Sequence, residues 1–311
     1  MAEILRKYTD PYEQLEFYAR NVVEGFITGM HRSPYHGFSV EFAEHRLYNT
    51  GESTRHIDWK LFAKTDRLYV KRYEEETNLR CHLVVDCSPS MYFPVADTID
   101  PENPNKIVFA TYAAAALAHL FKKQRDAVGL TALADGIKTF MPAATTQSHH
   151  RRMVTELGQL LEQKPPFAPS QTQLVDRLNE LAERLHKRSL VIIFSDMFEQ
   201  SERGIDEVFK ALQHFKYNKH EVILFHLSDG SLERDFEYPD RPTEFVDLET
   251  GESLKVNPRD IREGVVKAYS QFTHDLKVKC GQYKIDWIDA DIRQGFDQIL
   301  LPFLLKRSKL Y

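Results

Sequence analysis

The sequence predicts an α/β protein built on a doubly wound, mostly parallel sheet, and two observations predict it. From residue 105 onward, short apolar runs of strand length alternate with amphipathic stretches of helix length. Two apolar runs, residues 79–85 and 189–194, are rich in β-branched side chains and each breaks into small polar residues that include an aspartate. Such alternation is typical of βαβ units, in which helices cover both faces of the sheet.

The elements of this sheet are expected in a regular order. Residues 106–124 are apolar nearly all round and rich in alanine, which is typical of a helix packed closely on a sheet. Asp135-Gly136 is a hairpin turn signal, so residues 137–141 should run back as an antiparallel edge strand. The remaining expected elements are strands at 79–85, 128–134, 189–194, 221–227 and 283–288, helices at 147–163, 170–185 and 202–215, a helix before residue 283, and a final helix to residue 306.

Two segments interrupt the alternation and set the expected domain organisation. Residues 1–78 do not follow a βαβ pattern; they predict an amino-terminal α+β segment that opens with an amphipathic helix. In it Trp59 is expected to be a buried anchor and Arg55 to pair with an acidic residue such as Asp58. Residues 79–311 form the α/β domain, with a polar insertion at about 229–256 that contains a hairpin turned at residues 249–252.

Composition excludes several classes of function. The 41 basic residues are outnumbered by 46 acidic ones, so we expect no nucleic acid as partner. The sequence shows no apolar run long enough for a membrane span and no signal peptide at its start, so we expect no membrane insertion. Three cysteines form a sparse, odd set, which favours reduced thiols and a cytoplasmic location.

Oxygen-bearing side chains follow two of the predicted strands. Asp86, Ser88 and Ser90 leave the first strand at alternate positions, and Asp196 follows the strand at 189–194. Thr172 stands at the mouth of the intervening helix. Because ligands bind at the carboxyl ends of the strands in an open α/β sheet, all five residues fall on the ligand-binding edge. Carboxylates and hydroxyls are hard ligands, which suit Mg²⁺ or Mn²⁺. The alternative interpretation is a polar turn, with Thr172 as a helix N-cap and Asp196 as a strand end.

The order of these residues resembles the metal-ion-dependent adhesion site of von Willebrand factor type A domains. In that family an Asp-x-Ser-x-Ser loop follows the first strand, a later loop supplies a threonine, and a second aspartate follows another strand. The resemblance implies that Asp86, Ser88, Ser90, Thr172 and Asp196 hold a divalent ion, Mg²⁺ or Mn²⁺. This sequence has Ser170-Gln171 where the family has two glycines, and Met197 where it has a third.

The upstream stretch resembles a second family. The run from Gly51 to Trp59, followed by residues 63–68 and three glutamates at 74–76, is similar to the signature of the family called domain of unknown function 58. Glu52 replaces the aspartate that is usual in that signature. Members of the family commonly accompany AAA-type ATPases of the MoxR class. The resemblance therefore implies a non-catalytic, metal-dependent protein–protein interaction module, an adaptor or co-chaperone whose partner is a MoxR-type ATPase.

Two other functions stay open at the level of sequence. A magnesium-dependent phosphoester hydrolase would use Asp86 as nucleophile and Asp196 to hold the ion. Ser88, however, stands where aspartyl-phosphate enzymes of the haloacid dehalogenase type place a second aspartate as general acid. A P-loop motif is absent from the sequence, which disfavours an ATPase. The third possibility is a metal-free scaffold, in which water fills the cluster of oxygens.

Overall fold

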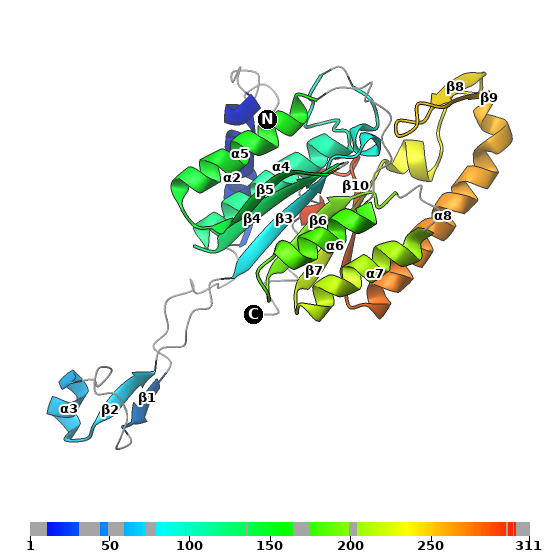
Figure 1. Ribbon diagram of the computed structural model, residues 1–311. Coiled ribbons are helices and arrows are strands. Elements are labelled where there is room, and N and C mark those ends of the chain that lie inside the picture. The colour runs from blue at the N-terminus through cyan, green and yellow to red at the C-terminus, as the bar shows by residue number, and fades with distance from the viewer. Residues whose placement is uncertain are drawn as a thin grey trace. The chain divides into compact units, whose positions relative to one another are not determined.

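A computed structural model describes residues 11–30, 44–48, 59–72, 79–96, 98–134, 136–163, 174–198, 204–296, 298–300 and 302 (Figure 1). The chain divides into two compact units. One consists of Met1–Phe26 together with Leu79–Tyr311, and the other of Ile27–Asn78. The expected boundary after residue 78 coincides with the end of the second unit, but the amino-terminal residues group with the α/β unit.

The α/β unit is built on a six-stranded sheet with the order β10-β7-β6-β3-β4-β5. Neighbouring strands are parallel except for β5, which pairs antiparallel with β4 at the edge. The prediction of a mostly parallel sheet with one antiparallel edge is therefore confirmed. The strands are β3 (Arg80–Asp86), β4 (Ala127–Leu133), β5 (Ile137–Ala144), β6 (Leu190–Ser195), β7 (Glu221–Ser228) and β10 (Asp286–Asp291).

Helices lie on both faces of this sheet (Figure 1). On one face α4 packs against α5, and on the other α6 packs against α7. The second face also holds the carboxyl end of α8, whose Leu276 and Cys280 belong to the same apolar core as the side chains of α6 and α7. The helices are α4 (Lys106–Lys123), α5 (Gln147–Leu161), α6 (Leu174–Arg184), α7 (Gly204–Tyr217) and α8 (Pro258–Gln282).

Helix α4 is buried over most of its length, as its sequence predicts. Asn105 caps its amino end, because its side-chain oxygen accepts a hydrogen bond from the backbone N–H of Val108 at 3.0 Å. Four successive alanines, Ala113 to Ala116, are at most 2% exposed, and their small size lets the helix approach its neighbours closely. The cap matters for the site described below, since it fixes where the first turn of α4 begins.

The amino-terminal helix α2 (Pro11–Met30) explains why its residues group with the α/β unit. Its apolar stripe, which includes Leu15 and Val23, is buried as the helical spacing predicts. The ring of Tyr18 lies 4.8 Å from that of Tyr112 on α4 and 5.2 Å from that of Phe296, both with edge-to-face geometry. The stripe therefore packs within the α/β unit.

The insertion between β7 and α8 contains the predicted hairpin. Strands β8 (Thr243–Val246) and β9 (Ser253–Val256) pair antiparallel, and the turn between them places Gly251 at a φ of 75°. Before the hairpin, a single π-helical turn, η3 (Gly230–Arg234), follows β7. Gly230 has no room for a side chain, because a Cβ there would lie 2.2 Å from a carboxylate oxygen of Asp291. This close approach joins η3 to the end of β10.

The strand predicted at 283–288 begins three residues later, at Asp286. Helix α8 continues to Gln282, and the chain then turns through Lys284, whose φ is 54°. The N–H of Ile285 still bonds back to the carbonyl of Cys280 at 2.9 Å, so these residues close the helix. Their apolar side chains pack on the core from a turn, which periodicity alone does not distinguish from a strand. Most of the predicted final helix lies outside the described residues.

In the second unit, β1 (Glu44–Leu47) and β2 (Tyr69–Arg72) form an antiparallel pair and α3 (Trp59–Thr65) precedes β2. The expected burial of Trp59 is wrong for the described residues, because 60% of its surface is exposed. Its ring meets Phe62 edge-to-face at 6.1 Å, and none of the α3 side chains is buried. A seven-residue helix beside a two-stranded ribbon offers too little apolar surface to enclose an indole. Arg55 and Asp58 lie outside the described residues.

Two further findings concern the described helices and the three cysteines. None of the described helices combines the length and the apolar character that a membrane crossing requires. All three cysteines, Cys81, Cys87 and Cys280, are buried and form no disulfide with one another. Burial raises the pKa of the Cys280 thiol to about 12, so this thiol stays protonated at neutral pH.

A buried histidine in the middle of the sheet predicts how stability depends on pH. His82 on β3 is 2% exposed, and its Nε2 lies 2.7 Å from the hydroxyl of Thr131. Burial lowers its pKa to about 3 from the ordinary 6.5. Below pH 6.5 the unfolded chain therefore binds a proton that the folded chain does not, and stability falls as pH falls towards 3. This single group contributes a loss of up to roughly 1.4 kcal/mol per pH unit.

Denaturant titrations at pH 4 to 7 would measure how the free energy of unfolding changes with pH in the wild type and in His82→Gln. The glutamine side chain does not titrate, so neither the folded nor the unfolded variant binds a proton at this position. The variant should lose less stability on acidification than the wild type does. His274→Gln on α8, which changes an exposed ring, is the matched control and should keep the wild-type slope. An unchanged slope in His82→Gln would contradict the assignment.

Candidate functional site

The two aspartates predicted at the edge of the sheet do come together. Asp86 is the last residue of β3, and Asp196 directly follows β6. These strands are neighbours in parallel register, with Val85 opposite Phe194. Both carboxylates therefore leave the sheet at its carboxyl edge, where Asp86 is 3% and Asp196 7% exposed. The charge of Asp196 raises the pKa of Asp86, so the two carboxylates lie close enough to repel each other.

Asp86 is held by hydrogen bonds from both sides. Its Oδ1 accepts the backbone N–H of Ser88 at 2.9 Å, and its Oδ2 accepts the hydroxyl of Ser195 at 2.6 Å. The Ser195 oxygen in turn accepts the N–H of Met197 at 2.8 Å. The loops after β3 and β6 are thus joined through one carboxylate. Sequence reasoning did not select Ser195, because it is the last residue of β6 and not part of the loop that follows.

The two predicted serines lie next to each other. After β3 the chain turns into η2 (Pro89–Tyr92), a single turn of 3₁₀ helix that begins with a proline. Ser88 is buried, and its hydroxyl oxygen lies 3.1 Å from that of Ser90. Neighbouring ligands of an octahedral magnesium ion, each about 2.1 Å from it, are separated by about 3 Å. The spacing of the two hydroxyls is therefore compatible with one octahedral edge.

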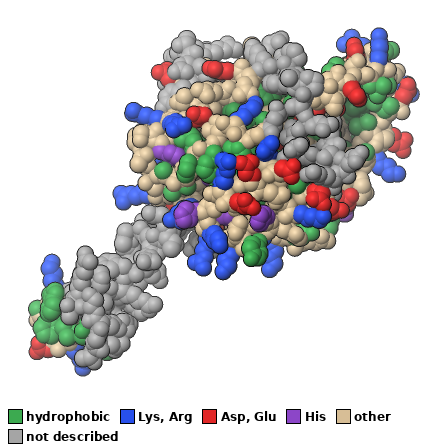
Figure 2. All heavy atoms as spheres, in the orientation of Figure 1, with side chains coloured by type: hydrophobic (Ala, Val, Ile, Leu, Met, Phe, Trp, Pro, Cys, Tyr) green, Lys and Arg blue, Asp and Glu red, His purple; other side chains and the backbone are tan. Residues whose placement is uncertain are grey.

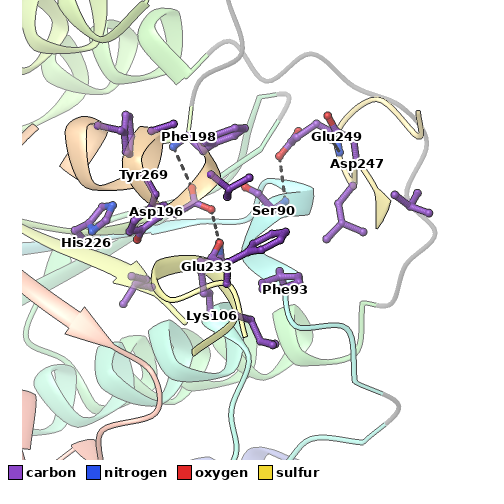
Figure 3. Close-up of a pocket in the computed structure, with 18 of the residues that line it drawn as sticks. Ser90, Phe93, Lys106, Asp196, Phe198, His226, Glu233, Asp247, Glu249 and Tyr269 are labelled. Atoms are coloured by element: carbon purple, nitrogen blue, oxygen red, sulfur yellow. Dashed lines mark hydrogen bonds and ion pairs between the residues drawn. The ribbon is translucent and has the colours of Figure 1, made fainter. Parts of the chain in front are cut away.

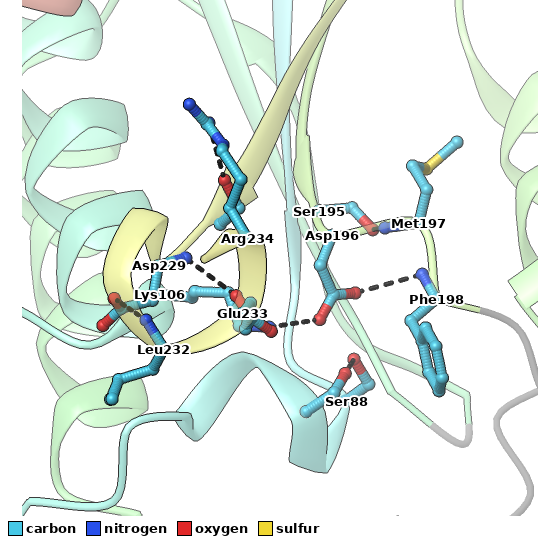
Figure 4. Close-up of polar contacts among 12 residues, drawn as sticks. Ser88, Lys106, Ser195, Asp196, Met197, Phe198, Asp229, Leu232, Glu233 and Arg234 are labelled. Carbon is cyan, nitrogen blue, oxygen red and sulfur yellow. Dashed lines mark hydrogen bonds and ion pairs between the residues drawn. The ribbon is translucent and has the colours of Figure 1, made fainter. Parts of the chain in front are cut away.

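Asp196 is engaged by a buried ammonium group. Its Oδ2 accepts a hydrogen bond from Lys106 Nζ at 2.7 Å, and its Oδ1 accepts the N–H of Phe198 at 3.2 Å. The same Nζ donates to Glu233 Oε1, also at 2.7 Å (Figure 4). Lys106 stands in the first turn of α4 and is 1% exposed. The ion pair therefore joins β6, α4 and η3 at one point.

Lys106 and Glu233 were not predicted from sequence. A lysine that opens an otherwise apolar helix is a signal that could have identified Lys106, because a charge there needs a buried partner. Glu233 offered no such signal, since it lies in the insertion. Its Oε2 accepts the N–H of Asp229 at 2.7 Å, so the side chain of Glu233 bonds to the residue that precedes the π-helical turn.

A second carboxylate that sequence reasoning missed comes from the β8–β9 turn. Glu249 is 8% exposed, and its Oε1 accepts the backbone N–H of Ser90 at 3.0 Å (Figure 3). Its own N–H donates to Asp247 Oδ1 at 2.8 Å, so the turn is closed by a local side-chain bond. The insertion thus covers the loop after β3 with an acidic group.

The charges at this edge do not balance. Burial, followed by the charge of Asp196, raises the pKa of Asp86 to about 6, and burial raises the pKa of Glu249 to about 6. Burial also raises the pKa of Glu233. For Asp196 burial acts in the same direction, but the Lys106 ammonium outweighs it and lowers the pKa of this aspartate. Among the residues that the structure describes at this edge, four carboxylates therefore face one ammonium, and a further cation would be favoured here.

Four of the five predicted metal ligands, all except Thr172, lie within the described residues. Thr172 lies outside the described residues, as does the proline-rich loop before it. Within the described ranges, no group of three or more His, Cys, Asp or Glu side chains is arranged to hold a metal ion. The predicted set has only two carboxylates, Asp86 and Asp196, and takes its other oxygens from hydroxyls. In donor type and in the spacing of Ser88 and Ser90, the described residues fit a small hard cation.

Comparison with protein families shows to which family the chain belongs. The family described as Protein of unknown function DUF58 matches residues 44–275, well over half of the sequence. The chain belongs to the DUF58 family. The match includes the loops that carry Asp86 and Asp196 and the insertion that carries Glu233 and Glu249.

Two relatives of this DUF58 protein, both from Mycobacterium, are described as uncharacterized proteins. A protein of Mycobacterium tuberculosis is 27% identical over 228 residues, which cover 73% of this chain and 66% of that protein. A protein of Mycobacterium bovis matches to the same extent. The aligned segment spans slightly less than two thirds of these relatives.

Solved structures resemble the chain at low sequence identity. An aerotolerance-related membrane protein from Bacteroides fragilis aligns with a TM-score of 0.41 and 13% identity, covering 71% of this chain and 96% of that one. The conserved hypothetical protein BatB from Bacteroides thetaiotaomicron aligns with a TM-score of 0.40 and 14% identity, covering 74% and 99%.

The Lys106 ion pair predicts a large effect on stability. Lys106→Met leaves the buried Asp196 and the partly buried Glu233 without their cation, which should lower the free energy of unfolding by about 3–5 kcal/mol. Adding Glu233→Gln should recover part of that loss, because one of the two unpaired charges is then removed. Urea titrations at neutral pH would measure both.

The matched control for this prediction is Lys123→Met at the other end of α4. Its ammonium lies 3.8 Å from Glu24 and its side chain is 38% exposed, so the change should cost less than about 1 kcal/mol. Equal stabilities of Lys106→Met and Lys123→Met would show that the buried pair contributes nothing to the fold.

Proposed function

We propose that this DUF58 protein is a non-catalytic, divalent-metal-dependent protein–protein interaction module with a von Willebrand factor A-like fold. The observation that carries the proposal is the excess of buried carboxylates beside two adjacent hydroxyls at the carboxyl edge of the sheet. Asp86 and Asp196 are kept close together at the cost of mutual repulsion, and a cation between them would relieve it. The fold assignment rests on the resemblance of the motif together with the mostly parallel sheet.

The residues that would hold the ion are Asp86, Ser88, Ser90 and Asp196, together with Thr172, which lies outside the described residues. A bound Mg²⁺ or Mn²⁺ would supply a positive charge with coordination positions left open to an anionic oxygen. The serine and threonine hydroxyls add no negative charge, so the two aspartates alone neutralise the ion. A carboxylate presented by a partner protein is the group that such a site would favour.

Binding is better supported than hydrolysis by the surroundings of Asp86. A nucleophilic carboxylate needs an oxygen that can approach the phosphorus atom. Both oxygens of Asp86 accept hydrogen bonds, one from Ser88 and one from Ser195, and the residue is 3% exposed. Ser88, which stands two positions later, has no carboxyl group to act as general acid. These contacts favour a positioning role for Asp86 over attack on a phosphoester.

The proposed partner is an AAA-type ATPase of the MoxR class. This part of the proposal rests on the family resemblance, because DUF58 proteins commonly accompany such ATPases. The chemistry of the site adds that the partner should present an aspartate or glutamate. Complex formation with a purified MoxR-type ATPase should then require Mg²⁺ and reverse on addition of a chelator.

Thermal unfolding in the presence and absence of Mg²⁺ tests the metal site. A ligand that binds only the folded state adds about 2.7 kcal/mol at a hundredfold excess over its Kd, so the melting temperature should rise by several degrees. Asp86→Asn should abolish this response. Without metal the variant should be as stable as the wild type or more so, since it removes one of two neighbouring like charges.

Asp240→Asn is the matched control for this experiment. Asp240 is exposed in the insertion and pairs with Arg259 at 3.5 Å, so this substitution should leave the response to Mg²⁺ intact. A response that persists unchanged in Asp86→Asn would place the ion elsewhere. The absence of any response in the wild type would favour a metal-free scaffold.

A further inference from the structure

A cavity of about 560 Å³ opens directly beside the proposed metal site (Figure 3). At one end it is bounded by Ser90, Asp196 and Glu249, the polar residues already described. Elsewhere its lining is mostly apolar and comes from the loop after η2, from the insertion and from α8; the apolar residues include Phe93, Leu232, Phe236, Leu248, Val265 and Phe272. This size and this composition, apolar with a few polar groups at one end, are typical of ligand-binding sites.

The wall that the insertion contributes is itself well packed. The ring of Phe236 lies 4.9 Å from that of Tyr238 and stacks on that of Phe245 at 5.5 Å. Tyr238 meets Phe245 edge-to-face at 5.0 Å. The three rings form a small core within the insertion, which gives the cavity a defined shape on that side.

The base of this wall is anchored to the sheet. Asp229, at the end of β7, is buried and accepts hydrogen bonds from Arg293 Nε at 2.8 Å and from the N–H of Leu232 at 3.0 Å. The N–H of Gly230 donates to Asp291 Oδ1 at 3.0 Å. These three contacts fix the π-helical turn that carries Glu233 and Leu232 into the cavity. The cavity is thus part of the folded structure of the α/β unit.

Two apolar side chains at this cavity are left largely in water. Phe198 follows Asp196 and is 53% exposed, and Val246 at the end of β8 is 56% exposed. Both belong to the lining of the cavity. Apolar surface beside a concave apolar site is characteristic of surfaces that bind a partner. A ligand that enters the cavity would cover both side chains.

The charge at the polar end restricts what this ligand can be. The ammonium of Lys106 already donates to Asp196 and Glu233, so it offers little attraction to an anionic ligand. Without a metal ion the acidic end would attract an ammonium group and repel a carboxylate. With a divalent ion bound as proposed above, a carboxylate becomes the favoured group at this end.

We propose that the cavity binds a bulky apolar side chain, aromatic or long aliphatic, on the same partner segment whose acidic residue reaches the metal. This inference rests on the proposed function and adds the second recognition element: a peptide with an acidic residue next to a large apolar one. The carboxylate makes the interaction depend on metal, and the apolar side chain makes it selective, because burial in the cavity distinguishes it from a small residue.

Two small carboxylates and one amine serve as probes for this site. The titrations use 3-phenylpropionate, acetate and phenethylamine, with Mg²⁺ or with a chelator, and follow the chemical shifts of the protein by NMR. With Mg²⁺, 3-phenylpropionate should bind at least tenfold more tightly than acetate, because both present a carboxylate but only one has a ring to bury. The chelator should abolish the binding of both.

Val265→Trp on α8 tests the cavity by filling it. This variant should lose the tenfold advantage of 3-phenylpropionate while its melting temperature still rises with Mg²⁺, a response that also shows the variant to be folded. Ala268→Phe, at a second lining position, should act in the same direction. Val278→Trp makes the same substitution at a position on α8 that is 44% exposed and outside the cavity, and should behave like the wild type.

Each outcome separates this inference from the proposed function. If Mg²⁺ raises the melting temperature but 3-phenylpropionate binds no more tightly than acetate, the cavity assignment is overturned and the metal site stands. Binding of phenethylamine in the presence of chelator, stronger than that of 3-phenylpropionate with Mg²⁺, would also overturn it and indicate a cationic apolar ligand. If Mg²⁺ has no effect on the wild type, both proposals fail together.

Discussion

The contact on which the α/β unit depends most is the ammonium of Lys106 between Asp196 and Glu233, 2.7 Å from each. It joins the end of β6, the first turn of α4 and the π-helical turn of the insertion. Taking one ammonium and two carboxylates out of water has a large desolvation cost, and the attraction between them offsets it only when every polar atom has a partner. The second oxygen of each carboxylate meets this condition, since it accepts a backbone N–H, from Phe198 in one case and from Asp229 in the other.

That ion pair also determines the charge available at the rest of the edge. Lys106 neutralises one of the two negative charges on Asp196 and Glu233. The second of these charges remains, together with those on Asp86 and Glu249. Coverage by the insertion makes the surroundings less polar than water, and charges in such an environment interact more strongly. The imbalance is therefore stronger than it would be at an open sheet edge, where solvent would screen it. The insertion is in this sense part of the site, because it both adds acidic groups and reduces the screening between them.

The sequence was sufficient to predict the sheet and the placement of Asp86 and Asp196. Buried parallel strands need continuous apolar runs, and residues that directly follow neighbouring parallel strands must meet at one edge. It was not sufficient for Glu233 and Glu249, because their contacts depend on how a polar insertion folds back over residues more than 100 positions earlier in the chain. Trp59 fails for a related reason: a large apolar side chain predicts burial only where enough neighbouring surface exists to enclose it.

The architecture separates two tasks that the proposed binding site would have to perform. The parallel sheet holds the oxygens of Asp86 and Asp196 at fixed positions, since each belongs to or directly follows a strand that is buried on both sides. The insertion forms the apolar wall and contributes Glu249, and its shape comes from its own aromatic core. A change in the insertion would therefore alter which side chain fits the cavity while leaving the oxygens of the strands in place. If the proposed function holds, a sheet edge of this kind would keep one mode of binding while the segment that covers it determines the partner.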